Sequence, residues 1–417
     1  MTPAARLQAT IEILDGTGGT NMPADRFIRE FFRARRYAGS KDRAAISERV
    51  FQIYRHRAAL AWRMQSETSR ALVIASLLAE DTSNNEIESL FSGTGYGPPP
   101  LTDAERAAIA GPPTGAPPLH VKGEFPAFHE SELTERFGGN LLPEMQALTC
   151  RAPVDLRVNT LKAARDDVLA VLREDGYAAE PAPFAPNGIR IASGEGAAQL
   201  SSHRLYKSGA FDFQDEAAQI AAILCDAQPG MRVLDITAGT GGKALALAAA
   251  MNNEGSIVAT DIAPARLKQI GPRAMRAGVA IVHTHENPRG RFARVLADAP
   301  CSGSGTWRRQ PEQKWRLTRE RLTEFLAIQD NLLDRAAAHV APGGRLIYVT
   351  CSLLPCENER RIAAFLDRVP GFAAISAAAI WRETVGAPLP PGMGEFFCAS
   401  PYATGTDGFF AAVLVRV

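Results

Sequence analysis

The stretch MRVLDITAGTGGK, residues 231–243, decides the fold class of this 417-residue chain. The apolar segment MRVLDI is a strand candidate, and three glycines follow it where a strand would turn into a helix. Glycines at such a turn let the backbone approach a ligand closely. We therefore predict a ligand-binding loop whose members are Thr237, Ala238, Gly239, Thr240, Gly241, Gly242 and Lys243.

Strand and helix candidates alternate from about residue 205 to the end of the chain. Further apolar strands are expected at 255–261, 279–284, 293–300, 345–352 and 408–417. Helical stretches such as Pro264–Ala277 and Arg319–His339 separate most of them. This alternation predicts an α/β fold with a doubly wound, Rossmann-like, mostly parallel sheet.

The second strand candidate ends at Asp261, which lies 22 residues after Gly239. An acid at about 20 residues from a glycine turn is the usual partner of ribose hydroxyls, so the spacing predicts a nucleoside cofactor. Glycine-rich turns also occur in many other doubly wound proteins. The loop lacks the dinucleotide pattern Gly-x-Gly-x-x-Gly, and Ala244 stands where a phosphate-binding loop needs Ser or Thr.

Two cysteines follow strand candidates directly: Cys301 in DAPCSGSG and Cys351 in YVTCS. The carboxyl ends of parallel strands share one edge, so both thiols are expected beside the glycine loop. A thiolate that adds to carbon 6 of a cytosine enables carbon 5 to attack a methyl sulfonium, and a second thiol can assist release. Asp298 can hydrogen-bond the ring nitrogen. Either cysteine alone is also typical of a small buried hydrophobe.

These motifs resemble the bacterial Fmu/Sun-type RNA cytosine-5 methyltransferases, relatives of the eukaryotic Nop proteins. The resemblance covers about Phe211 to the C-terminus. Besides the glycine loop and Asp261, it rests on DAPCSGSG with the following WRRQPEQKWR, YVTCSLLPCENE, QDEAAQ at 214–219 and DGFF at 407–410. It implies a class I methyltransferase domain that uses S-adenosylmethionine.

The resemblance also assigns roles to individual residues. It implies that Cys351 is the nucleophile, that Cys301 assists product release, and that Lys243 and Asp298 belong to the catalytic group. The implied cofactor contacts are residues 237–243, Asp261, Asp298 and a residue after the third strand, where HTHENPRG offers Glu286 or Asn287. Thr240 stands where the family usually has proline. No metal site is expected.

The remaining chain is expected to form three parts. Residues 1–92 read as helices and resemble a NusB-like RNA-binding domain, most clearly in SKDRAAISERVFQIYRHR. Residues 93–144 are expected to be a Gly/Pro-rich linker with a connecting helix, because the stretch Gly93–Pro118 is dense in both residues. Residues 145–204 are expected to be a small α/β RNA-binding subdomain, and residues 205–417 the catalytic domain.

Cationic side chains gather in two places. Arg26–Arg63 holds eleven Lys/Arg against three acidic residues, which is typical of a polyanion partner and also of a solvated helical face. Beyond the reactive loop, cations alternate with tryptophans, a pattern that favours single-stranded RNA or a surface helix with a buried tryptophan. The predicted RNA contacts there are Arg308, Arg309, Lys314 and Trp315.

Composition limits the class of protein. The net charge is only +1, no run approaches the roughly 18 apolar residues of a membrane span, and no export signal is visible, so a cytoplasmic protein without membrane contact is expected. Six dispersed cysteines without a Cys-x-x-Cys pair predict free thiols. The family resemblance, together with the NusB-like N-terminal region, implies 16S ribosomal RNA as the substrate. The alternatives are transfer RNA, or an inactive RNA-binding assembly protein. A monomer is the default.

Overall fold

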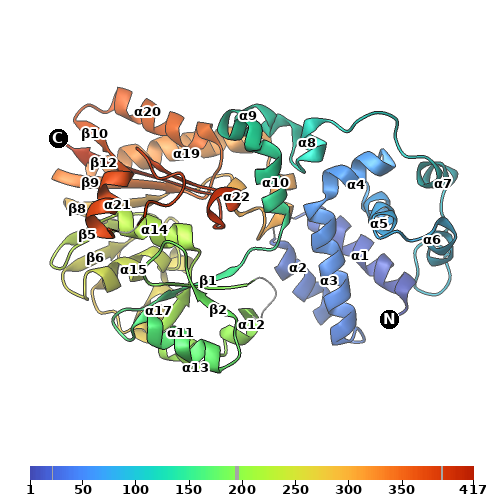
Figure 1. The fold of residues 1–417 in the computed structure, drawn as a ribbon, viewed down its shortest axis with the longest axis horizontal. Coiled ribbons are helices and arrows are strands. Elements are labelled where there is room, and N and C mark those ends of the chain that lie inside the picture. Colours follow the sequence, from blue (N-terminus) through green and yellow to red (C-terminus); the bar gives the residue numbers. More distant parts are fainter. Residues whose placement is uncertain (21, 193–196, 387) are drawn as a thin grey trace. The chain divides into compact units, whose positions relative to one another are not determined.

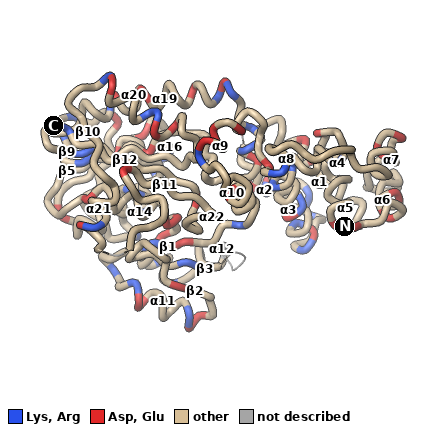
Figure 2. Tube along the Cα trace, turned by 45° about the horizontal axis from the view of Figure 1, so that its top comes forward, with Lys and Arg blue, Asp and Glu red and all other residues tan. Residues whose placement is uncertain are grey.

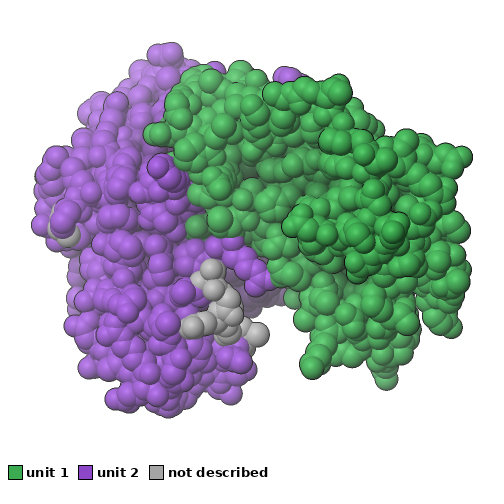
Figure 3. Space-filling view, turned by 45° about the vertical axis from the view of Figure 1, so that its right-hand side comes forward, with its two compact units in different colours: residues 1–150, 307–318 green, residues 151–306, 319–417 purple. Residues whose placement is uncertain are grey.

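The computed structural model describes residues 1–20, 22–192, 197–386 and 388–417. Two compact units divide the chain, and Figure 3 distinguishes them by colour. Unit 1 comprises residues 1–150 and 307–318, and unit 2 comprises residues 151–306 and 319–417. The segment 307–318 therefore belongs to the N-terminal unit, although it follows the Cys301 loop in sequence.

Unit 1 is helical throughout its described residues. Its core is formed by apolar side chains of the first helices, and seven of the ten residues of α5 are buried. The helices are α1 (Pro3–Gly18), α2 (Ala24–Arg33), α3 (Ser40–Arg55), α4 (Arg57–Met64), α5 (Ser69–Leu78), α6 (Asn84–Leu90), α7 (Asp103–Ala110), α8 (Leu119–Lys122), α9 (Glu130–Phe137), α10 (Leu141–Thr149) and α18 (Pro311–Arg316). The NusB-like character of this unit stays a prediction.

Helix α7 corrects the expected linker, because it lies inside the stretch that its glycines and prolines assigned to a loop. The Thr102 hydroxyl accepts a hydrogen bond from the Glu105 amide, and the Glu105 carboxylate accepts one from the Thr102 amide. This capping box satisfies the first amides of a short helix. A helical segment thus fits between two Gly/Pro runs. No described helix is both long and apolar enough to cross a membrane.

Unit 2 contains an eight-stranded sheet (Figure 1). Strands β9, β8, β5, β6 and β7 are parallel in that spatial order, as the alternation predicted, whereas β12 pairs antiparallel with β9, β10 and β11. The strands are β5 (Arg232–Asp235), β6 (Ser256–Ala259), β7 (Val282–Thr284), β8 (Phe292–Asp298), β9 (Val340–Thr350), β10 (Phe372–Ile375), β11 (Phe397–Ala399) and β12 (Phe409–Arg416).

Helices cover both faces of this sheet (Figure 1). Side chains alternate between the faces along a strand, so Leu346 and Tyr348 pack in one core and Ile347 and Val349 in the other. The first core lies under α19 (Arg319–Ala338) and α20 (Glu359–Arg368). The second lies under α14 (Glu216–Leu224), α15 (Gly242–Ala250), α17 (Ile270–Ala277) and α21 (Ala377–Thr384).

One expected helix is divided in two. The stretch Pro264–Ala277 forms α16 (Pro264–Leu267) and α17 rather than one helix. Pro272 has no amide hydrogen to donate to the carbonyl four residues earlier, and its ring fits only the first turn of a helix. The new helix therefore begins two residues before Pro272.

A second, four-stranded sheet forms the small α/β module, as expected. Its order is β2 (Ala179–Pro181), β3 (Gly188–Ile191), β1 (Val154–Val158) and β4 (Phe211–Phe213), and α11 (Arg165–Glu174) packs on it. Strand β4 pairs with β1 although it lies beyond the expected boundary at residue 204. Three residues are too few for a sequence pattern to reveal a strand.

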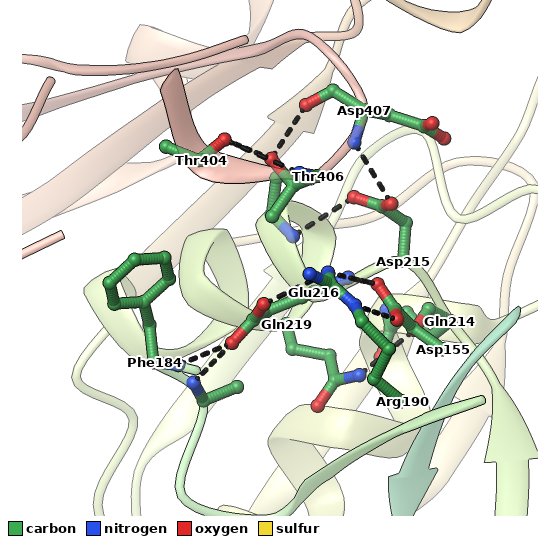
Figure 4. A network of polar contacts seen from close by, with 12 residues as sticks. Asp155, Phe184, Arg190, Gln214, Asp215, Glu216, Gln219, Thr404, Thr406 and Asp407 are labelled. Atoms are coloured by element: carbon green, nitrogen blue, oxygen red, sulfur yellow. Dashed lines mark hydrogen bonds and ion pairs between the residues drawn. The ribbon is translucent and has the colours of Figure 1, made fainter. Parts of the chain in front are cut away.

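A buried ion network joins this small sheet to α14 (Figure 4). The Arg190 guanidinium donates to both oxygens of Asp155, at 2.8 and 2.9 Å, and to Glu216 at 3.1 Å. The side chains of Asp155 and Glu216 are fully buried. Glu216 also accepts the backbone amides of Phe184 and Ala185, so the QDEAAQ motif holds the small sheet to the first helix of the large one.

The same motif connects to the DGFF motif at the other end of the chain. Asp215 caps α14 by accepting the Ala217 amide at 2.9 Å, and its second oxygen accepts the Asp407 amide at 3.0 Å (Figure 4). The QDEAAQ and DGFF motifs therefore have a structural role, because the hydrogen bond between them fixes where β12 begins relative to α14.

Replacing Arg190 by Met should lower the free energy of unfolding of the protein by about 3 kcal/mol, because two buried carboxylates would lose their cation. Urea denaturation followed by circular dichroism measures this change. The matched control is Arg173→Met, whose exposed pair with Glu180 should contribute less than about 1 kcal/mol. Equal losses in both variants would contradict a structural role for the network.

Candidate active site

A cavity of about 770 Å³ opens at the carboxyl edge of the parallel strands in unit 2. Its wall includes the glycine loop after β5, Asp261 after β6, Asp298 to Cys301 after β8, Cys351 after β9, and one face of α19. This volume lies within the range of about 300–1,000 Å³ typical of small-molecule sites. The structure thus brings both predicted cysteines and the predicted loop to one place.

The glycine loop is fixed by Asp261. The Gly239 amide donates to one carboxylate oxygen of Asp261 at 2.9 Å, and the Ala263 amide donates to the other at 2.8 Å. Gly239 and Gly241 have φ angles of +55° and +87°, a region that disfavours residues with a β-carbon. The glycines are therefore required by the backbone, and Asp261 both shapes the loop and lines the cavity.

Two arginines hold the loop from the side of the small sheet. Arg273 donates to the carbonyl and the hydroxyl of Thr240, both at 2.7 Å, and to Asp212 of β4 at 2.5 Å. Arg157 of β1 is buried and donates to the Gly242 carbonyl at 2.7 Å, and burial lowers its pKa to about 10. Thr240, which stands where relatives usually have proline, is thus fixed by hydrogen bonds.

Asp235 at the end of β5 lines the cavity but is only 1% exposed. Neither of its carboxylate oxygens accepts a hydrogen bond of ordinary geometry from the described residues. Burial raises the pKa of Asp235 to about 7; Lys243 and a weak contact with the Thr237 amide oppose this rise, and the carboxylates of Asp298 and Asp261 add to it. A buried carboxylate without a partner is expensive. It therefore fits a donor or cation on a bound ligand.

Lys243 and Asp298 form an ion pair beside the cysteines. The Lys243 ammonium lies 2.6 Å from the Asp298 carboxylate, and the Asp298 amide donates to the Thr237 hydroxyl at 2.7 Å. Burial acts to lower the pKa of Lys243, but Asp298, Asp235 and Cys351 outweigh it and the pKa is raised. Lys243 therefore stays charged, and its positive charge faces the Cys351 side of the cavity.

The two sulfur atoms of Cys301 and Cys351 are 3.4 Å apart. The Cys301 pKa is raised well above its usual value, first by the hydrogen bond to Cys351 and then by burial. Cys301 is thus held as the protonated partner. Such a thiol can donate to a neighbouring thiolate and can accept a proton once it is itself ionised.

Glu357 clamps the turns that carry the two cysteines. Its buried carboxylate accepts the Ser302 amide at 2.8 Å, the hydroxyls of Ser302 and Ser352, and the Gln329 side-chain amide at 3.0 Å. Ser302 and Ser352 each follow a cysteine directly. One side chain from the PCENE segment therefore fixes both thiols against each other.

Gly305 explains the glycines that follow Cys301. Its amide donates to the Cys351 carbonyl at 2.9 Å, and its own carbonyl accepts the Gly408 amide at 2.9 Å. A β-carbon on Gly305 would lie 2.0 Å from the Gly408 carbonyl oxygen, which is impossible without displacing the backbone. The DGFF motif thus locks the Cys301 loop against the turn of Cys351.

Some predicted contacts lie outside this cavity. Its described lining omits Gly241, which packs against Ile270, and also omits Glu286 and Asn287, which are exposed after β7. The Glu286 carbonyl accepts from the Thr260 hydroxyl at 3.3 Å, and Thr260 directly precedes Asp261. The role of Glu286 or Asn287 as the adenine partner stays a prediction.

The predicted RNA contacts need a correction, because Arg308 and Lys314 are 5% and 2% exposed. Lys314 lies inside unit 1 near Glu124 and over the rings of Trp307 and Trp315. Burial lowers the Lys314 pKa to about 8, and Glu124 opposes the shift. The alternation of cations and tryptophans thus marks a packed segment. Arg309 alone of the predicted cations is exposed.

The rest of segment 307–318 is anchored in the same unit. The Trp315 indole donates to the Tyr54 carbonyl at 2.7 Å, and Arg316 donates to the carbonyls of Thr17 and Met22, both at 2.9 Å. Trp315 is therefore partly used in packing rather than offered to a base.

Sequence reasoning missed two parts of the site. Asp235 had a signal, an acid at the end of the strand before the glycine turn. The face of α19 had none, because the spacing of Phe325, Ile328, Leu332 and Arg335 predicts a helix but not what the helix faces. No group of three or more His, Cys, Asp or Glu able to hold a metal occurs among the described residues.

The parallel sheet with a glycine turn, an acid after the second strand and a cavity at the carboxyl edge defines the class I methyltransferase fold. Family models support this. The model "16S rRNA methyltransferase RsmB/F" matches residues 222–415, and the model "Methyltr_RsmF/B-like, ferredoxin-like domain" matches residues 125–196. Residues 125–196 and 222–415 thus match the RsmB/F family, in agreement with the Fmu/Sun-type family that the motifs resemble.

Individual relatives agree. Ribosomal RNA small subunit methyltransferase B of Salmonella arizonae is 34% identical over 281 residues, which are 65% of this chain and 62% of that protein. The chain thus matches less than two thirds of the length of this relative. The crystal structure of PH0851 is 25% identical, has a TM-score of 0.77 and covers 99% of both chains. A methyltransferase homolog from Pyrococcus horikoshii is 25% identical, with a TM-score of 0.61, over 72% of this chain and 97% of that chain.

Replacing Asp235 by Asn should change how stability depends on pH. In the folded protein this carboxyl ionises near pH 7, whereas in the unfolded chain it ionises near 3.9. Folded wild type therefore loses stability as pH rises through this window, and the variant does not. Between pH 5 and 8 the variant should gain on the order of 2 kcal/mol relative to wild type in denaturant titrations. Parallel pH profiles would refute the assignment, and Asp167→Asn, at an exposed site, is the control.

Replacing Arg273 by Met should loosen the glycine loop, because two hydrogen bonds from a charged group to Thr240 are lost. We expect hydrogen exchange of the amides of residues 238–243 to accelerate about tenfold. The matched control is Arg276→Met, since Arg276 also contacts Asp212, at 3.3 Å, but not the loop. Equal exchange in the two variants would show that Arg273 does not fix the loop.

Proposed function

We propose that the protein transfers a methyl group from S-adenosylmethionine to carbon 5 of a cytosine in RNA, through a covalent bond between Cys351 and carbon 6. The observation that carries this proposal is the pair of sulfur atoms 3.4 Å apart, beside the Lys243–Asp298 ion pair and in one cavity with the glycine loop. The family match supports methylation of RNA, and the cysteine pair supports cytosine carbon 5.

The cavity residues fit the cofactor. The unpartnered carboxylate of Asp235 suits a cationic or hydroxyl group, Asp261 lines the cavity at the edge of the loop, and the glycines leave room for close approach. S-adenosylmethionine supplies an electrophilic methyl group when it is bound. The exposed Ile262 after Asp261 lines the cavity and is a candidate for the wall beside the adenine, together with the predicted Glu286 or Asn287.

The residues divide the chemistry among themselves. The Cys351 thiolate adds to carbon 6, and the ring gains electron density that the Lys243–Asp298 pair stabilises near the ring nitrogen. After carbon 5 is methylated, it must lose its proton. Once Cys351 is bonded to carbon 6, its sulfur is no longer the thiol partner that raises the Cys301 pKa, and Cys301 gives its proton to water. The Cys301 thiolate then takes the carbon 5 proton, the electron pair of that C–H bond re-forms the ring double bond, and the bond from Cys351 to carbon 6 breaks to return the Cys351 thiolate. Because the base is attacked from its face, it must be unpaired or flipped out.

We propose small-subunit ribosomal RNA as the substrate. This proposal is supported by the family model and by relatives named as ribosomal RNA small subunit methyltransferases, which this chain matches over 62% of their length. Unit 1 and the small sheet are proposed to contact this RNA. Transfer RNA is the alternative within the same chemistry. A catalytically inactive assembly protein is a weaker candidate, because Thr240 is held in place and the reactive pair is intact.

Two cysteine variants test the mechanism. Purified protein is mixed with radiolabelled S-adenosylmethionine and small-subunit ribosomal RNA, transfer RNA or DNA, and the labelled nucleoside is identified after digestion. Wild type should yield 5-methylcytosine in ribosomal RNA. Cys351→Ala should lower the rate about 10⁴-fold or more, since the nucleophile is lost. Cys301→Ala should accumulate a protein–RNA adduct that survives a denaturing gel.

Cys150→Ala is the matched control, because this thiol is exposed in unit 1. Full activity of Cys351→Ala would overturn the assignment of the nucleophile. A different labelled nucleoside would overturn the cytosine proposal, and absence of cofactor binding would favour the inactive assembly protein.

A further inference from the structure

Unit 1 contains a cavity of about 780 Å³ that the proposed reaction does not use. It lies between the start of α1, the connection from α2 to α3, and the turn at residues 93–97. Tyr37 and Tyr96 both line it, at 72% and 90% exposure. Tyrosine usually buries most of its ring. Two tyrosines presented to solvent on one cavity therefore call for a partner.

Both rings are mounted on ordered backbone. Tyr96 sits in a turn closed by hydrogen bonds from the Gly93 amide to the Pro98 carbonyl, at 2.9 Å, and from the Gly97 amide to the Thr94 carbonyl, at 3.1 Å. The residue after Tyr37, Ala38, is 2% exposed, and its amide donates to the Arg35 carbonyl at 3.1 Å. The exposure of the rings is thus built into the fold.

The cations around Tyr37 differ from the others in the basic stretch Arg26–Arg63. Eight of its eleven Lys/Arg are engaged by groups of unit 1: Arg26, Arg29, Arg35, Arg43, Arg49, Arg55, Arg57 and Arg63. The other three are Arg33, Arg36 and Lys41, which are exposed and pair with no described residue. Figure 2 shows Lys and Arg in blue along the chain at α2 and α3. These three cations lie within four residues of Tyr37 along the chain, although they do not themselves line the cavity.

We propose that this cavity binds an unpaired stretch of RNA, with bases stacked on Tyr37 and Tyr96 and with phosphates held by Arg33, Arg36 and Lys41. Exposed rings beside unpaired cations are what a single strand requires, and a duplex hides the faces of its bases from such rings. The inference deepens the proposed function by placing one site of RNA contact. It is independent of the chemistry in unit 2.

Stacking is tested with the full-length variants Tyr37→Ala and Tyr96→Ala and a fluorescein-labelled, unstructured uridine-rich RNA. Each variant should raise the dissociation constant about tenfold, because one base loses its stacking partner. Tyr37→Phe and Tyr96→Phe keep the rings and should bind as wild type does. Wild-type affinity in both Ala variants overturns the proposal, and so does an equal loss in the Phe variants.

The cations are tested by salt dependence. The triple variant Arg33→Gln, Arg36→Gln, Lys41→Gln should reduce the slope of log affinity against log salt concentration by about 2, since each phosphate contact on a single strand contributes about 0.7. The matched control, Arg26→Gln, Arg29→Gln, Arg106→Gln, removes the same charge from ion-paired side chains. Equal slopes in the two triple variants would mean that the RNA responds to overall positive charge rather than to these three side chains, and would overturn the site. Equally tight binding of an RNA duplex would overturn it as well.

S-adenosylmethionine binding measured on the same proteins separates the two proposals. It should be unchanged in all unit 1 variants, because none of these side chains lines the cavity of unit 2. Loss of RNA binding with intact cofactor binding supports this inference. A wild-type protein that binds the RNA in this way yet yields no 5-methylcytosine would refute the proposed reaction and leave the RNA site standing.

Discussion

The parallel pairing of β8 with β9 is the constraint on which the site depends. Asp298 is paired with Val349, so the two chains leave the sheet side by side and reach Cys301 and Cys351 within three residues. The sulfur separation of 3.4 Å follows from that register together with the Glu357 clamp. A one-residue slip would turn one thiol to the other face of the sheet and separate the pair. The chemistry is thus a property of strand register before it is a property of the cysteines.

Around this pair, buried polar groups provide precision rather than stability. Glu357, Asp235 and Lys243 each carry the desolvation penalty of a charge or carboxyl away from water. Glu357 offsets this penalty with four donors, whereas Asp235 has only a weak contact with the Thr237 amide among the described residues. The two carboxyls therefore have different roles: Glu357 holds the two cysteine turns together, whereas Asp235 is available to a ligand in the cavity.

The sequence predicted the parts of this protein that follow a periodic pattern or a short motif. MRVLDITAGTGGK gave the strand, turn and helix that the structure has, and DAPC and YVTC marked the ends of adjacent strands. What remained hidden depends on tertiary partners. Lys314 was predicted to contact phosphate because nothing in WRRQPEQKWR reveals its neighbour Glu124. Strand β4 was not predicted because three residues are too few to show an alternating pattern. The choice between Glu286 and Asn287 stays open, because a chain direction after a strand is set by packing.

Segment 307–318 follows the Cys301 loop of unit 2 in sequence but belongs to unit 1. Only residues 302–306 separate Cys301 from this segment, and five residues span less than about 20 Å even when extended. Arg316 and Trp315 are hydrogen-bonded to carbonyls of unit 1, and Glu312 accepts the Ala24 amide at 3.0 Å. The chain that leaves the reactive loop is therefore held by the fold of unit 1. A catalytic domain expressed without residues 1–150 would leave Trp307 and Lys314 without the side chains that surround them in unit 1.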